Sequence, residues 1–211
     1  MNFDNPIGAE FRAVREVERE GRAARAIEGS RVYSTAADDL WDALTSAERI
    51  PRWFLPISGD LEVGGRYRLQ GNAEGMIERC EPPKALDITW EFGGSVSWVS
   101  LRLEPEAGGT RLTLVHTMLR DEAGEAHWKT YGPGATGVGW DLSFLGLGMH
   151  LASGGEAIDP AESEAWLGSE PGKAFARASA ASWGEAHVEA GENAEVARAM
   201  AARTAGFYTG G

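Results

Sequence analysis

Residues 134–151 form a long, mostly apolar segment that limits the folds open to this chain. Apolar side chains recur there at helical spacing and cover most of the helix circumference. A helix of this kind has to be surrounded by other elements. Asp141 lies near its middle, and a carboxylate at the centre of a bilayer costs at least about 2.5 kcal/mol. We therefore expect a buried helix here, and no membrane span.

Four glycines interrupt this predicted helix: Gly137, Gly139, Gly146 and Gly148. Each costs roughly 1 kcal/mol relative to alanine inside a helix, so some compensating role is needed. Close approach of another backbone would supply it, and so would space left for a ligand. The sequence leaves both explanations open.

Composition and charge exclude several classes of function. The chain has 211 residues, 43% of them hydrophobic, which suits one domain with an appendage or two small domains. A net charge of -12 argues against nucleic acid or an anionic membrane as a partner, because phosphate binding requires a basic surface.

Cysteine usage and missing motifs limit the compartment and the cofactors. Cys80 is the only cysteine, so no internal disulfide or cysteine-based metal site can form. Since the N-terminal residues also lack the apolar core of a secretion signal, we expect a cytoplasmic protein. The histidines show no metal-ligand spacing such as HExxH, and no glycine-rich phosphate loop follows a strand, so we expect no metal and no cofactor.

The N-terminal third alternates between extended and helical patterns. A turn at Gly21 is expected to join two strands, and hydroxyl or carboxylate side chains near residue 35 are expected to cap a helix. Pro51 has to bend or end a second, short helix. The segments are a loose leader over 1–10, strands over 11–18 and 22–33, a helix opening at 34–39 and a short helix over 47–53.

Five further strands are predicted, separated by tight turns rich in glycine and proline. Such short connections join neighbours that run in opposite directions, so the sheet is antiparallel. Alternation of apolar and polar residues gives the sheet one apolar face, onto which Leu112, Leu114, His116 and Met118 of the last strand point. The strands are expected over 66–70, 75–80, 85–92, 97–104 and 110–119.

Two segments flank the long helix. Residues 120–133 are polar and contain His127, Trp128 and Tyr131, and we interpret them as a lid over an opening. Residues 155–211 are rich in alanine and glutamate and predict a helical extension packed on the main domain, with helices capped by Asp159, Ser169 and Asn193.

Four sequence blocks follow one another in a characteristic order. They are residues 32–54 with VYS, LWDALT and IPRWF, residues 64–67 with GGRY, residues 81–90 with EPPKAL and TW, and residues 109–116 with GTRLTLVH. These blocks resemble the activator of Hsp90 ATPase homologue-like (AHSA-type) domains of the START-like superfamily, also called SRPBCC or Bet v-like. The resemblance covers about residues 21–154 and implies an α+β helix-grip fold, in which an antiparallel sheet wraps around a long C-terminal helix. We therefore assign residues 11–154 to this domain.

The resemblance does not choose a function, because its superfamily includes lipid carriers, polyketide cyclases, hydroxylase subunits and non-enzymatic binders. Our main hypothesis is a non-catalytic protein that holds a small hydrophobic or aromatic molecule in an internal cavity. Aromatic side chains under the helix suit such a pocket, although they also suit an ordinary core. The candidate ligand-binding residues are Trp41, Trp53, Phe54, Trp90, His116, Met118, Trp128, Tyr131, Trp140, Asp141, Phe144 and Leu145.

Two alternatives remain open at this point. An enzyme of the cyclase, hydrolase or isomerase type would use Asp141 with His116 or His127 as acid and base. The competing interpretations are a core histidine bonded to a carbonyl for His116, a flanking ion pair with an arginine for Asp141, and a solvated loop residue for His127. The other alternative is a chaperone-interacting protein, and a homodimer is also compatible with the sequence.

Overall fold

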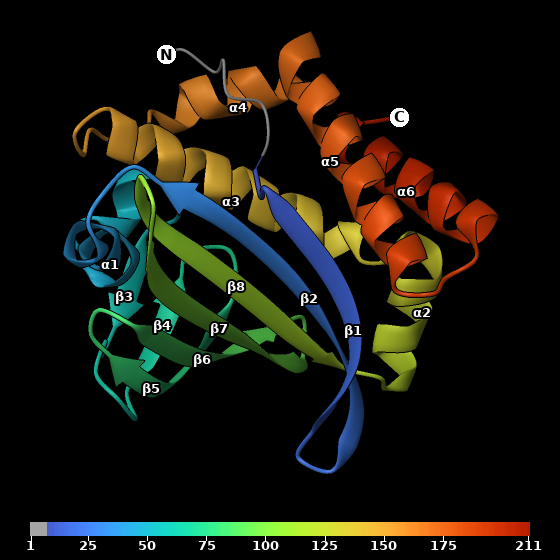
Figure 1. Ribbon diagram of the computed structural model, residues 1–211, viewed down its shortest axis with the longest axis horizontal. Coiled ribbons are helices and arrows are strands. Elements are labelled where there is room, and N and C mark those ends of the chain that lie inside the picture. Colours follow the sequence, from blue (N-terminus) through green and yellow to red (C-terminus); the bar gives the residue numbers. More distant parts are fainter. Residues whose placement is uncertain (1–7) are drawn as a thin grey trace.

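The computed structural model describes residues 8–211, which contain an eight-stranded antiparallel sheet and helices that cover one of its faces (Figure 1). The strand order is β1-β2-β8-β7-β6-β5-β4-β3, so the N-terminal hairpin adds to the edge of β8. The strands are β1 Phe11–Arg19, β2 Arg22–Tyr33, β3 Ile57–Gly59, β4 Arg66–Leu69, β5 Glu74–Glu81, β6 Ala85–Phe92, β7 Ser95–Glu106 and β8 Gly109–Leu119.

The predicted antiparallel arrangement and the predicted hairpin turn are confirmed. Glu20 and Gly21 both have positive φ, 55° and 74°, which the turn between β1 and β2 requires. The short strand β3 was not predicted, because three residues are too few to show a period of two.

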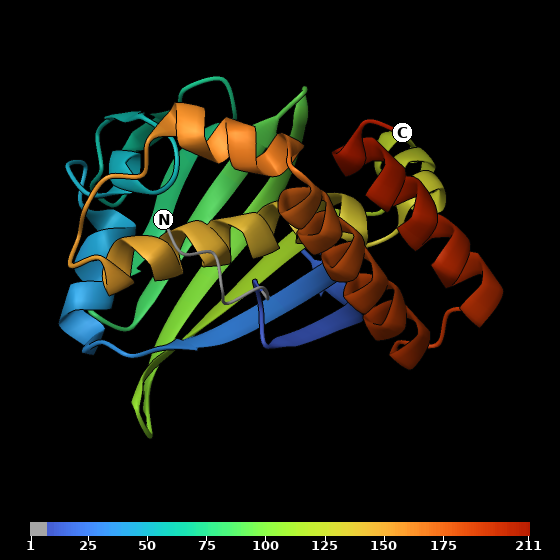
Figure 2. The ribbon, with the colours of Figure 1, turned by 90° about the horizontal axis from the view of Figure 1, so that it is seen from above.

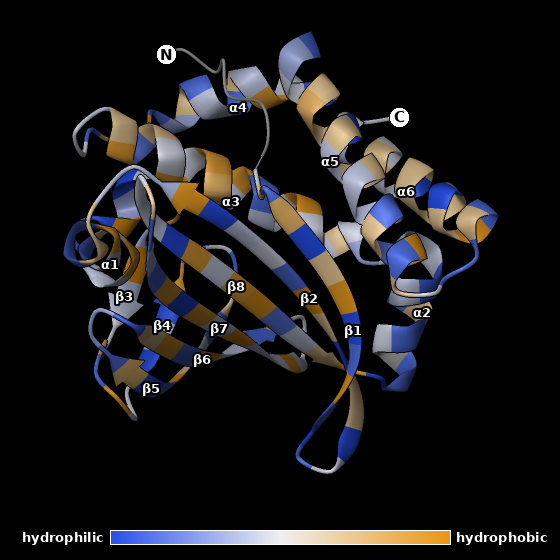
Figure 3. Cartoon of the chain, viewed as in Figure 1, coloured by the Kyte–Doolittle hydropathy of each residue, from blue (hydrophilic) through white to orange (hydrophobic). Residues whose placement is uncertain are grey.

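The long helix α3, Gly134–Ala152, lies across the apolar face of the sheet (Figure 2). Leu112, Leu114 and His116 alternate with less buried neighbours along β8, as the sequence predicts, and Figure 3 shows the same alternation of colour along the strands. In the ladder, Leu114 pairs with Leu101 and His116 with Val99 of β7. The core therefore lies between the sheet and α3.

The glycines of α3 do not share one role. A Cβ on Gly137 would lie 2.3 Å from the ring of Trp183, and one on Gly146 would lie 2.9 Å from the carbonyl oxygen of Trp53. Those two glycines allow close approach of neighbouring elements. Gly139 instead lines a cavity that is described below.

The helix that precedes the sheet differs from the prediction in its cap. Helix α1, Ala37–Thr45, has Ala36 at its N-cap, and no side chain caps it. The Thr35 hydroxyl instead donates to the Asp39 carboxylate at 2.6 Å. The predicted second helix is a single 3-10 turn, η1 Ile50–Arg52, with Pro51 in its first turn.

Most of the segment 120–133, which we interpreted as a lid, forms helix α2, Glu122–Tyr131. Asp121 caps it by accepting a hydrogen bond from the Gly124 amide at 2.9 Å, and Gly132, with a φ of 64°, ends it. The polar composition gave no apolar periodicity that would predict a helix, whereas the cap and the stop signal do mark its two ends.

Three helices form the C-terminal extension, and the capping side chains predicted for them are confirmed. Asp159, Ser169 and Asn193 each accept a hydrogen bond from a backbone amide of the following turn. Helix α5 packs against α3 and β1, while α6 packs against α5 and α2 (Figure 1). The helices are α4 Pro160–Gly168, α5 Glu170–Glu189 and α6 Ala194–Thr209.

The predicted leader is packed where the structure describes it. Residues 1–7 of that leader lie outside the described residues. Ala9 is fully buried, and its amide donates to the Asp141 carboxylate at 2.8 Å. The Glu10 amide donates to the carbonyl oxygen of Ser30 at 2.8 Å, so residues 8–10 are not loose.

No helix among residues 8–211 is long and apolar enough to cross a bilayer. Within the same residues, no three histidine, cysteine, aspartate or glutamate side chains gather into a group that could hold a metal ion.

A two-part cavity beneath the long helix

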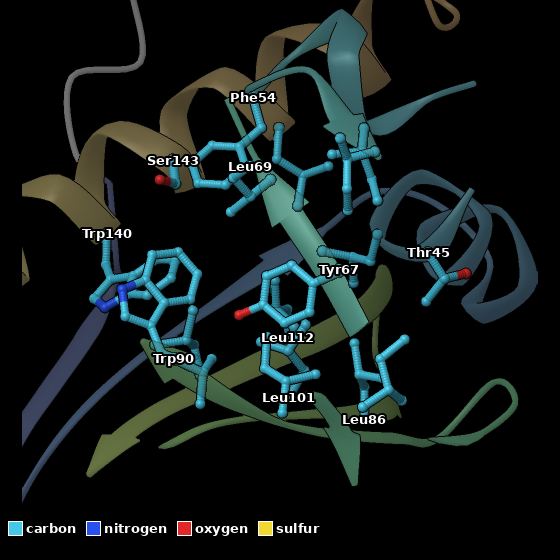
Figure 4. A pocket seen from close by; sticks show the side chains of 18 of the residues that line it. Thr45, Phe54, Tyr67, Leu69, Leu86, Trp90, Leu101, Leu112, Trp140 and Ser143 are labelled. Atoms are coloured by element: carbon cyan, nitrogen blue, oxygen red, sulfur yellow. The ribbon is translucent and has the colours of Figure 1, made fainter. Parts of the chain in front are cut away.

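An apolar cavity of about 130 Å³, which we call the inner chamber, lies between α1, η1, the sheet and α3 (Figure 4). Almost all of its exposed wall is carbon. Its lining includes Leu44, Trp53, Phe54, Tyr67, Leu69, Ile77, Cys80, Leu86, Ile88, Trp90, Leu101, Leu112, Leu114, Trp140, Ser143, Phe144 and Leu147.

The inner chamber offers dispersion contacts and very few hydrogen bonds. The hydroxyl of Tyr67 donates to the carbonyl oxygen of Thr89 at 2.7 Å, so this side chain presents its ring to the space. Burial raises the pKa of Tyr67, which keeps the hydroxyl neutral. Apolar cavities of about 150 Å³ stay dry and accept benzene, so this chamber suits an apolar or aromatic group.

A second cavity of about 580 Å³, the outer chamber, adjoins the first. It lies between the tip of the β6–β7 hairpin and helices α2, α3 and α6, and its wall mixes aromatic rings with polar groups. Its lining includes Arg25, Phe54, Trp90, Phe92, Val96, Ser97, His116, Met118, Asp121, His127, Trp128, Tyr131, Gly139, Trp140, Ser143, Thr204, Phe207 and Tyr208.

Two tryptophans separate the chambers. Phe54, Trp90, Trp140 and Ser143 line both spaces. The rings of Trp90 and Trp140 meet edge to face with centroids 5.1 Å apart, and Figure 4 shows them together at the end of the inner chamber opposite Thr45. Their position decides whether the chambers connect.

His116 holds both tryptophans through a directed chain of hydrogen bonds. Trp140 Nε1 donates to His116 Nδ1 at 3.1 Å, so the histidine proton must be on Nε2. That nitrogen lies 2.8 Å from Ser97 Oγ, and the serine hydroxyl donates to the Trp90 carbonyl oxygen at 3.0 Å. His116 is 4% exposed, and burial lowers its pKa to about 4, so the ring is neutral at pH 7.

We expect His116 to make folding stability depend on pH. Its pKa falls from 6.5 to about 4 on folding, so between these values the unfolded state binds a proton that the folded state does not. Its contribution is complete above pH 6.5 and falls by about 1.4 kcal/mol per pH unit as the pH drops towards 4. Burial also lowers the pKa of His187, which adds a slope of the same sign.

Urea unfolding of the natural chain and of the His116→Gln variant, at about pH 7.5, 6 and 5, measures this effect. The difference between the two proteins gives the contribution of His116 to the pH dependence of the free energy of unfolding, because the other groups titrate in both. The variant should lose less stability on acidification. Equal slopes in the two proteins would contradict this prediction.

Asp141 lies away from both chambers, so the hypothesis that it faces the cavity is wrong. Its carboxylate is fully buried and accepts from Arg12 Nη2 at 2.8 Å, from the Ala9 amide and from the Ser179 hydroxyl. The flanking ion pair is therefore the correct alternative. Asp141 shares no cavity with His116 or His127, which removes the geometry that the proposed acid–base pairs need.

The remaining candidate residues divide between the chambers. Trp53 and Phe144 line the inner chamber, and Met118, Trp128, Tyr131 and the catalytic candidate His127 line the outer one. Trp41 and Leu145 line neither, because they pack into the core around α1 and α3.

Sequence reasoning missed part of the lining. Leu86 and Ile88 share a strand face with Trp90, so their alternation contained the signal for the inner chamber. Phe207 and Tyr208 reach the outer chamber from the end of α6, and no local pattern in the sequence signals that contact.

Comparison with known families identifies the chain. The model of the family described as Activator of Hsp90 ATPase homolog 1-like protein matches residues 34–151, which is more than half of the sequence. The protein belongs to this family. The predicted resemblance is thereby confirmed, and the family match ends at the end of α3, before the C-terminal extension begins.

Solved structures agree with this assignment. The crystal structure of CalU16 from Micromonospora echinospora is 33% identical, covers 82% of this chain and 97% of its own, and has a TM-score of 0.61. The solution structure of CalU16 is 30% identical, covers 85% and 96%, and has a TM-score of 0.67. MLL2253 from Mesorhizobium loti is 25% identical over 61% of this chain and 98% of its own, with a TM-score of 0.53.

These likenesses confirm the α+β helix-grip fold, in which the sheet wraps around α3. A comparison with curated protein sequences gave no match. Family and fold are compatible with ligand binding, and the choice of function has to come from the cavity itself.

Proposed function

We propose that this protein binds a small hydrophobic or aromatic molecule in the inner chamber, without catalysing a reaction. The observation that carries the proposal is an apolar cavity of about 130 Å³ between the sheet and α3. A filled core at this place would gain dispersion contacts that an empty space forfeits. A ligand would restore these contacts.

The polar groups near the cavity support binding without chemistry. Both ring nitrogens of His116 are engaged, one by Trp140 and the other by Ser97. The Asp141 carboxylate is bonded elsewhere, and burial lowers the pKa of His116 to about 4, so the histidine is a weak base at neutral pH. The acid–base pairs of the enzyme hypothesis are therefore not assembled.

Titration with 2-naphthol, a compact aromatic molecule, tests the proposal. We expect calorimetry to detect one site and Trp90→Ala to weaken binding about tenfold, because the truncated side chain loses its ring contacts in the wall. Trp41→Ala is the matched control, since Trp41 is also half-buried but lines neither chamber, and it should leave the affinity unchanged.

Cys80 provides an independent readout, because it is the only cysteine and lines the inner chamber. Saturating 2-naphthol should slow alkylation of Cys80 by N-ethylmaleimide, measured by mass spectrometry of the intact chain. Absence of binding together with unchanged alkylation would rule out the proposal, and so would native mass spectrometry and titration that detect no apolar ligand at all.

A chaperone partner, a homodimer and a cytoplasmic location stay predictions from the sequence. The extension does not form a free arm, because α5 packs on α3 and β1. A pull-down that fails to enrich Hsp90 would remove the chaperone hypothesis.

A further inference from the structure

The outer chamber depends on a helix outside the family match. The match ends at residue 151, whereas Thr204, Phe207 and Tyr208 of α6 line this chamber. Three side-chain hydrogen bonds hold α6 in place. Arg203 Nε donates to the Thr130 carbonyl oxygen, Thr204 Oγ1 donates to the Tyr131 carbonyl oxygen at 2.9 Å, and the Tyr208 hydroxyl donates to the Ala135 carbonyl oxygen at 2.8 Å. The wall that α6 supplies is therefore fixed to both α2 and α3.

Phe207 shows that this wall has an unused contact surface. Its side chain is 69% exposed although it lines the chamber, and its ring centroid lies 5.9 Å from that of Tyr131 and 5.3 Å from that of Tyr208. Folding buries little of this ring, so its apolar surface is available to a ligand. His127 extends the cluster, with its ring 5.3 Å from Tyr131.

Polar groups stand beside these rings. Within the described residues, the side chains of His127 and Tyr131 make no hydrogen bond to another residue, so both can bond a ligand. Arg25 lines the chamber too, but it is engaged by Glu16 and Glu125 and lies over Trp128. The outer chamber thus suits a ring that bears a hydroxyl or another neutral polar group.

Size and shared lining residues relate the two chambers. Sites for drug-sized ligands measure roughly 300–1,000 Å³, a range that includes the outer chamber and excludes the inner one. The spaces meet at Trp90 and Trp140, and a single hydrogen bond to His116 holds the Trp140 indole nitrogen. A turn of that indole would let one molecule pass between them.

We propose that the inner and outer chambers form one site for an elongated amphipathic molecule. Its apolar or aromatic end occupies the inner chamber, and a second ring with a polar substituent lies against Phe207 and Tyr131. This inference rests on the proposed function. It implies that the C-terminal extension determines which length of ligand the protein prefers.

Two matched ligands test the inference: 2-naphthol, and a longer probe in which a two-carbon ether links naphthalene to a phenol, 4-[2-(2-naphthyloxy)ethyl]phenol. The long probe should bind about tenfold more tightly than 2-naphthol, because an additional stacked ring contributes on the order of one such factor. Phe207→Ala should remove most of this gain, lowering the affinity for the long probe about tenfold more than that for 2-naphthol.

Val196→Ala is the control, because Val196 is an exposed apolar residue of the same helix that does not line the chamber. It should leave both affinities unchanged. Thermal melting of both variants verifies folding, which we expect to be intact since Phe207 is 69% and Val196 42% exposed. In a second variant, Tyr131→Phe, loss of the hydroxyl should weaken binding of the long probe more than that of 2-naphthol.

The outcomes separate the two proposals. If 2-naphthol binds but the long probe gains nothing, or if Phe207→Ala weakens both ligands equally, the joined site is wrong and the inner-chamber function stands. If 2-naphthol neither binds nor protects Cys80, the proposed function fails and the joined site fails with it. Binding of the long probe alone would place the ligand in the outer chamber only, and would also overturn the inference.

Discussion

Replacing Asp141 with alanine should lower the free energy of unfolding by about 3–5 kcal/mol, because it leaves Arg12 as an unpaired charge in the interior. Asp141 is fully buried, and the Arg12 side chain is only 9% exposed. The carboxylate also satisfies the Ala9 amide and the Ser179 hydroxyl. One substitution therefore leaves four donor groups, from three residues, without their acceptor.

The position of Asp141 explains why the effect should be large. Its partners come from the N-terminal segment, from β1 and from α5, so the residue ties the sheet edge and the C-terminal extension to α3. Arg12 lies over the ring of Trp183 at 5.9 Å, in the same layer between α3 and α5. We expect the variant to loosen the C-terminal extension along with the sheet edge.

Urea unfolding followed by circular dichroism measures this loss. The control is Glu106→Gln, which breaks the exposed pair with Arg111 and should cost less than about 1 kcal/mol. The double variant with Arg12→Met and Asp141→Leu should recover part of the stability, because it removes both charges. A loss below about 1 kcal/mol for Asp141→Ala would contradict the assignment of this residue as a buried ion-pair centre.

Filling the inner chamber should abolish binding of 2-naphthol. Ile88 lies on β6, is half-buried and lines this chamber. In the variant Ile88→Trp the larger side chain would occupy much of the 130 Å³ space, so we expect the affinity to fall roughly 100-fold. Val63→Trp serves as the control, because Val63 is 60% exposed and lines neither chamber.

Calorimetry gives the affinity, and thermal melting shows whether the variant is folded. Overpacking a core costs typically about 1–3 kcal/mol, so we expect a folded variant whose melting temperature is lower by roughly 2–12 °C. An affinity within about threefold of the natural chain, in a variant that is folded, would place the ligand elsewhere.

The sequence allowed the long helix, the antiparallel strands and the caps of α4, α5 and α6 to be predicted. The bounds expected for β6, residues 85–92, are those observed, because alternation and the turns that enclose it are local signals. The helix over 122–131 was not predicted, because the polar composition of the segment outweighed the cap at Asp121 and the stop at Gly132. For the inner chamber, the alternation along β6 indicated one wall. Phe54, Trp90 and Trp140, which line both chambers, were among the predicted aromatic residues.

Which side of the long helix faces the cavities was decided only by the tertiary structure. The α3 helix is apolar around almost its whole circumference, so its periodicity contains no preferred direction, and Asp141 could equally face the sheet or the extension. Contact with Arg12, 129 residues away in the chain, settles that direction. The same holds for Phe207, whose place in the outer chamber follows from how α6 docks on α2 and α3. Periodicity and caps act over a few residues, whereas these contacts form only once distant elements have packed.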